Sequence, residues 1–125
     1  MGLVSLRFHA SPSHLRTARL VAVTVARRAG FDEVEVEAVR QAIGEACALC
    51  VGRVGDDVEV TLTLDDTAEA AVRLVARVAP IDLRDGAEAT PLGLAVLAEL
   101  TDHYAFEETG EGSTLRLTWH DRHPA

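Results

Sequence analysis

Short runs in which apolar and polar residues alternate are the feature that most limits how this chain can fold. A period of two is typical of a strand with one buried face. In the first run, Val4, Leu6 and Phe8 lie on one face and polar residues on the other. The alternating runs are residues 3–9, 58–65, 72–78, 104–106 and 115–119. The chain is therefore expected to form five strands, of which the second and third make a β-hairpin.

Three other segments carry the periodicity and the end signals of amphipathic helices. Ser11 is placed to cap the first helix and Gly30 to end it, while Asp32 and Glu35 have the spacing of a capping box for the second. The third helix opens at a Thr-Pro pair. We expect helices over residues 12–29, 32–51 and 90–100.

The order of these elements predicts the fold class. It is β-α-α-β-β-α-β-β, with no repeat or linker, so residues 1–125 are interpreted as a single domain. A content of 48% apolar residues is enough for a hydrophobic core in a chain of this length. We expect an α/β sandwich, in which a mostly antiparallel mixed sheet is covered on one face by three helices.

Charge and composition exclude several classes of function. The formal net charge of −8 argues against a surface for nucleic acid or for an anionic membrane. All twelve basic residues are arginine, which excludes sites that need a P-loop lysine or a lysine Schiff base. No apolar run approaches the length of a membrane span, and a cytoplasmic location is expected.

Two pairs of residues raise the question of a metal or redox site. Cys47 and Cys50 form a C-x-x-C inside a helical segment, and they are interpreted either as a redox or zinc pair or as two small core residues. No nearby pair supplies the other two zinc ligands. His120 and His123 share the C-terminal tail, where two ligands make a poor site. No metal is expected.

Four segments together resemble the GHKL-type (HATPase) ATPase domain of RsbW-type anti-sigma factors, which are also serine-protein kinases. The resemblance covers nearly the whole chain, and each segment is a short match in the order that the family shows. The segments are residues 8–21, AIGEA at 42–46, the glycine-leucine helix and aspartate at 91–102, and GEGSTLRL at 110–117. The resemblance implies a Bergerat-type α/β sandwich and a homodimer.

The resemblance also implies roles for residues of a nucleotide site. Glu45 matches the catalytic base, but Leu49 stands where the family has the asparagine that holds Mg²⁺, and an aliphatic side chain offers no oxygen to that ion. Residues 77–81 lack the aspartate that reads adenine, and the lid segment 82–90 has one glycine. The vestigial nucleotide contacts are Gly93, Leu94, Gly110, Gly112 and Thr114. We expect these motifs to be degenerate.

The function expected from the resemblance is that of an anti-sigma factor or partner-switching regulator, in effect a pseudokinase without a cofactor. It would bind a sigma factor and an anti-anti-sigma protein of the STAS type through Arg16, Arg19 and Leu20. The alternative is an active serine kinase that phosphorylates the anti-anti-sigma protein with Mg·ATP and Glu45. In a third interpretation the fold is the same, but the pocket binds another small ligand or nothing.

Overall fold

The computed structural model describes residues 2–9, 11–51, 59–66, 72–81, 90–109 and 112–120. Its elements follow the predicted order β-α-α-β-β-α-β-β. They are β1 (Leu3–His9), α1 (Pro12–Arg28), α2 (Glu33–Val51), β2 (Glu59–Asp65), β3 (Val72–Ile81), α3 (Thr90–Leu100), β4 (His103–Thr109) and β5 (Gly112–His120). The expected α/β sandwich is confirmed.

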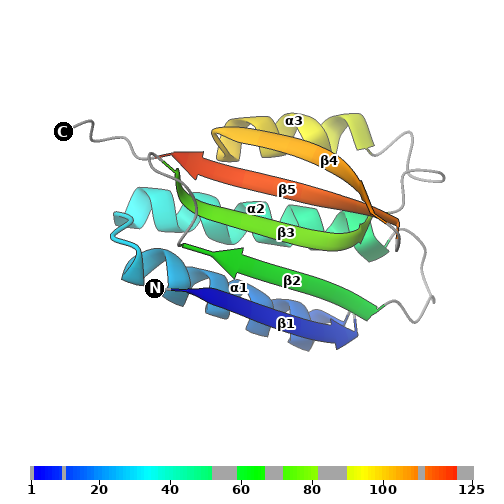
Figure 1. Cartoon of the computed structure of the whole chain (residues 1–125), viewed down its shortest axis with the longest axis horizontal. Helices are drawn as coiled ribbons and strands as arrows, with labels where there is room; N and C mark the ends of the chain where they lie inside the picture. Colours follow the sequence, from blue (N-terminus) through cyan, green and yellow to red (C-terminus); the bar gives the residue numbers. More distant parts are fainter. Residues whose placement is uncertain are drawn as a thin grey trace.

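The five strands form one sheet in the order β1-β2-β3-β5-β4. Each neighbouring pair of these strands is antiparallel, so the described sheet is antiparallel throughout rather than mixed. All three helices lie on the same face of the sheet, and the other face is open (Figure 1). The sandwich therefore has one helical layer and one sheet layer, as predicted.

An apolar row crosses the whole sheet and explains its register. Leu6 pairs with Leu62, Leu62 with Val78, Val78 with Leu115, and Leu115 with Phe106. The three central members of this row are fully buried. A shift by one residue would turn every side chain of a strand to the opposite face, so burial of this row favours a single register.

Helix α1 begins and ends where its sequence signals predict. The Ser11 side chain accepts a hydrogen bond from the backbone N–H of His14 at 3.3 Å, and Pro12 occupies the first helical position. Gly30 follows the helix with a φ of 88°, a conformation that residues with a Cβ rarely adopt. Alanines dominate the buried stripe, so α1 can lie close to its neighbours.

Helix α2 starts with the predicted capping box, and a distant arginine extends it. The Asp32 backbone N–H donates to Glu35 Oε1 at 3.0 Å, and the Glu35 N–H donates to Asp32 Oδ1 at 2.8 Å. Glu35 Oε2 accepts from Arg73 Nη1 on β3 at 3.0 Å. The Arg73 guanidinium also lies 4.0 Å from the centre of the Phe31 ring. This cluster ties the start of α2 to the sheet.

The turn from α3 into β4 is held by two hydrogen bonds to β5. Trp119 Nε1 donates to the carbonyl oxygen of Leu100 at 3.0 Å, and the backbone N–H of His120 donates to Asp102 Oδ2 at 2.8 Å. Asp102 is thus the structural turn residue that the sequence indicates.

None of the helices in the described part of the chain has the length and apolar character needed to cross a membrane.

We expect replacement of Arg73 by alanine to lower the free energy of unfolding by about 2 to 3 kcal/mol, because it removes an ion pair from the largely buried Glu35 carboxylate and the contact of the guanidinium with Phe31. The Arg73 and Glu35 side chains are 13% and 19% exposed. Urea denaturation measures the change. Arg40→Ala, which breaks an exposed pair with Glu37, is the control and should cost much less; equal losses would contradict this account.

Candidate functional site

The residues assigned to catalysis and metal binding lie on one flank of α2. Glu45 is half-buried and has no hydrogen bond or ion pair with any residue that the structure describes. Leu49 follows one turn later and packs against the hydrophobic core. Residues four apart share a side of a helix. Glu45 and Leu49 therefore occupy the same flank, in the relation that the resemblance implies.

This flank of α2 faces α3. The Cδ2 atom of Leu49 lies 3.6 Å from the point where a Cβ on Gly93 would stand, which is an ordinary van der Waals separation. Leu94, the next residue of α3, is half-buried against the core. The two helices thus meet through an aliphatic side chain at the position where a metal site needs an oxygen ligand.

The other predicted nucleotide contacts lie apart from this flank. Gly112 begins β5, and Gly110 lies outside the described residues. Thr114 alternates with the core residue Leu115 and lines a hollow on the open face of the sheet. A ligand held between the helices and the sheet cannot reach the Thr114 side chain. The structure therefore places Leu49 against Gly93 but leaves Thr114 on the opposite face of the sheet.

The predicted partner-binding residues share one side of α1. Arg16, Arg19 and Leu20 are related by steps of three and four, which places them on neighbouring positions of the helix surface. Arg16 is exposed, Arg19 is half-buried and Leu20 is 66% exposed. A large exposed apolar side chain one turn from an exposed arginine is a common arrangement at protein interfaces.

The electrostatics of α1 differ from those of the whole chain. Helix α1 contains four arginines and no acidic residue, whereas the chain has a formal net charge of −8. The start of α2 carries Glu33, Glu35 and Glu37 instead. Four of the twelve arginines of this acidic protein thus lie on α1 with no acidic residue among them, which favours contact of this helix with a negatively charged surface.

A comparison with protein families identifies the domain as a whole. The family described as "Histidine kinase-like ATPase domain" matches residues 8–119. The chain belongs to this family. A comparison with curated proteins gave no match. The superfamily expected from the resemblance is thereby confirmed, and the observed α/β sandwich is consistent with it.

In this histidine kinase-like ATPase domain, the end of β3 carries core residues where an adenine-reading aspartate was sought. Val78 and Ile81 are buried, Ala79 pairs with Thr61 of β2, and Pro80 lines the hollow on the open face. The following segment, residues 82–89, lies outside the described residues, and Gly86 with it. No carboxylate is therefore present on the described part of this strand end.

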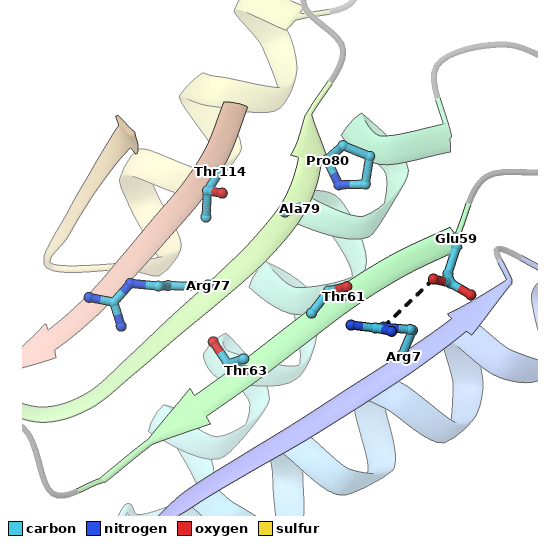
Figure 2. Close-up of a pocket in the computed structure, with 8 residues that line it drawn as sticks. All are labelled: Arg7, Glu59, Thr61, Thr63, Arg77, Ala79, Pro80 and Thr114. Carbon is cyan, nitrogen blue, oxygen red and sulfur yellow. Dashed lines mark ion pairs between the residues drawn. The ribbon is translucent and has the colours of Figure 1, made fainter. Parts of the chain in front are cut away.

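The open face of the sheet has a hollow of about 580 Å³ that the sequence analysis did not anticipate. Figure 2 shows Arg7 from β1, Thr61 and Thr63 from β2 and Arg77 from β3 around it, with the helices behind the sheet. Arg7 Nε lies 3.6 Å from a Glu59 oxygen, and Arg77 Nε lies 3.4 Å from one of Glu107. Because each arginine already faces a carboxylate, the hollow has no clear preference for a charged ligand.

The alternating strands of the sequence already indicate which side chains line this hollow, because they identify the positions that point away from the core. Those positions hold threonine and arginine in β2 and β3, next to the buried leucines and valines. A pattern of this kind predicts which residues face outward, but it does not predict which strands are neighbours. The sheet order β1-β2-β3-β5-β4 is needed to bring Arg7, Thr61 and Arg77 together.

The two cysteines belong to the core. Cys47 and Cys50 are free thiols with 0% and 2% exposure. Burial raises the pKa of Cys47 to about 12, against a smaller opposing effect of the Arg19 charge, and burial likewise raises the pKa of Cys50. The described residues contain no group of three or more His, Cys, Asp or Glu side chains that could hold a metal ion. This favours the interpretation of two small core residues.

We therefore expect both thiols of the native protein to react with a disulfide reagent at pH 8 at least about a hundredfold more slowly than free cysteine, because the thiolate is the reactive form and burial suppresses it. The rate of colour release from Ellman's reagent measures this. The urea-unfolded chain serves as the control and should react at once. Rapid reaction of either cysteine in the folded protein would show that the pair is accessible for redox chemistry.

Proposed function

We propose that this histidine kinase-like ATPase domain is an anti-sigma factor of the RsbW type that acts by docking rather than by phosphoryl transfer. In this proposal it binds a sigma factor through α1 in the cytoplasm and releases it when a STAS-type anti-anti-sigma protein competes for the same surface. A homodimer is part of the proposal. The family match supports the scaffold, while the partner and its release are inferred from the α1 surface.

The observation that carries the proposal is the state of Arg19. Its guanidinium is half-buried against α2, and it has no hydrogen bond or ion pair with any residue in the described part of the chain. A buried or half-buried charge normally has a partner, because losing water without gaining a counter-ion costs free energy. A carboxylate on a docked protein would supply that partner with two parallel hydrogen bonds.

The surroundings of Arg19 suit a protein rather than a small ligand. Leu20 presents an exposed aliphatic side chain beside it, and Arg16 adds a second positive charge one turn earlier. An apolar contact flanked by cations matches an acidic segment with an aliphatic residue on its surface. Electrostatic attraction between α1 and such a segment would also speed association.

The state of the α2 flank supports docking over catalysis. Phosphoryl transfer depends on positioning and on neutralising the phosphate charge with a metal ion. Leu49 packs on the core next to Gly93 and offers no metal ligand. Glu45 alone would remain as a base, and a base without bound Mg·ATP has no phosphate to transfer.

The proposal is tested by charge reversal at Arg19. The tagged full chain is purified from its native cell, the sigma factor that accompanies it is identified, and the Kd is measured with both proteins purified. We expect Arg19→Glu to raise the Kd by about 30-fold or more, since a lost charge pair at an interface typically costs 2 kcal/mol or more.

The matched control is Arg27→Glu, which makes the same change of net charge near the end of α1 where Arg27 pairs with Glu33. We expect this variant to bind within about threefold of the wild type, because exposed charges contribute little. Circular dichroism checks that both variants fold. If Arg19→Glu binds as tightly as Arg27→Glu, or if no sigma factor binds the purified chain, the proposed function is wrong.

A further inference from the structure

Gly44 stands in the interior of α2, where glycine is an unfavourable choice. Glycine makes a helix less stable than alanine does, because a glycine residue has more conformational freedom in the unfolded chain and loses more of it on folding. A Cβ built on Gly44 would lie 2.8 Å from Nε of Arg19, 3.1 Å from its Nη2 and 3.3 Å from its Cζ. The first separation is too short for non-bonded atoms, so the Arg19 guanidinium occupies the space that a side chain at position 44 would need.

The part of the α2 surface on which this guanidinium lies is apolar and uncharged. Cys47, which follows Gly44 by three residues and shares its side of α2, is fully buried. The pKa of its thiol is raised to about 12 by burial, so the thiol stays neutral at physiological pH. Neither Gly44 nor Cys47 therefore compensates the charge of Arg19, although the Arg19 charge does act on the thiol.

We propose that Gly44 is a positioning residue: by leaving this space on α2 empty, it holds the Arg19 guanidinium flat against the helix and ready to bind a carboxylate of the partner. This inference rests on the proposed function, because it concerns the same surface. It goes further in assigning a role to Gly44, a residue of α2 outside the α1 surface.

The advantage of this arrangement is that Arg19 is ordered before the partner arrives. A long arginine side chain loses many rotamers when it is fixed at an interface, and that loss weakens binding. Contact with the α2 backbone restricts the guanidinium in the free protein. Only a glycine at position 44 permits this contact, since even the single methyl group of alanine would displace Arg19.

The partner's chemistry follows from what surrounds the guanidinium. Its planar set of donors fits a carboxylate in a bidentate manner. Leu20, which follows Arg19 in α1, is 66% exposed and offers an apolar contact beside it. Helix α1 has no acidic residue that could compete for Arg19 within its own helix. The surface therefore selects an acidic residue that has an aliphatic neighbour.

The test is Gly44→Ala, which should affect stability and binding in opposite directions. We expect it to raise the melting temperature of the full chain, because alanine is the better helix former and the displaced atoms are the end of a flexible side chain. We expect it to raise the Kd for the purified sigma factor by about tenfold, because Arg19 loses its ordered position.

Val34→Ala is the matched control, since it places alanine, the better helix former, at an 82% exposed position of the same helix α2. We expect it to stabilise the fold in the same way and to leave the Kd unchanged. A double-mutant cycle gives the second readout. If Gly44 acts through Arg19, Gly44→Ala should have no further effect on binding in an Arg19→Ala background.

A third readout needs no partner. The Arg19 Nε–H signal in a ¹⁵N spectrum of the free protein should shift in Gly44→Ala and stay in place in Val34→Ala. An unchanged signal, or wild-type affinity of Gly44→Ala alongside weak binding of Arg19→Ala, would overturn the role of Gly44 and leave the proposed function standing. Wild-type affinity of Arg19→Ala itself would instead overturn the docking surface.

Discussion

The close packing of α1 on α2 through small side chains is the constraint on which the rest of the structure depends. Ala18, Ala22 and Ala26 of α1 and Ala42 and Ala46 of α2 are essentially inaccessible to solvent. Small residues let two helices approach while both still cover the same face of the sheet. This approach brings Arg19 onto Gly44, and it also shuts Cys47 and Cys50 away from solvent.

The same packing gives α2 two distinct flanks, one toward α3 and one toward α1. The flank of α2 toward α3 carries Glu45 and Leu49, while the flank toward α1 carries Gly44. A leucine in place of an oxygen ligand weakens the first flank for metal binding without disturbing the second. The proposed docking through α1 would therefore require no nucleotide in the domain, and a histidine kinase-like ATPase fold can serve as a binding module.

Much of the fold could be predicted because its signals are local in the sequence. Strand alternation, the Ser11 cap, the Asp32 and Glu35 capping box and the stop at Gly30 each involve residues a few positions apart, and the structure confirms them. The order of the strands in the sheet and the contact between Arg73 and Glu35 were not predicted. They join segments far apart in the chain, which periodicity does not relate.

The candidate site was predictable only in part for the same reason. Glu45 and Leu49 were singled out by the resemblance to the family, and their spacing of four residues keeps them on one flank of α2. That Thr114 faces away from the helices could have been inferred from its alternation with Leu115, whereas the contact of Arg19 with Gly44 could not, because it depends on how α1 crosses α2.

In the proposed function this ATPase domain acts by docking and does not use ATP. Calorimetric titration with Mg·ATP measures whether it binds the nucleotide. Inorganic tripolyphosphate with Mg²⁺ is the reference, since it carries the phosphates without the adenosine. The account predicts no saturable binding of Mg·ATP below about 1 mM, a range in which nucleotide-using enzymes commonly operate. Submillimolar binding that needs both adenosine and Mg²⁺ would contradict it.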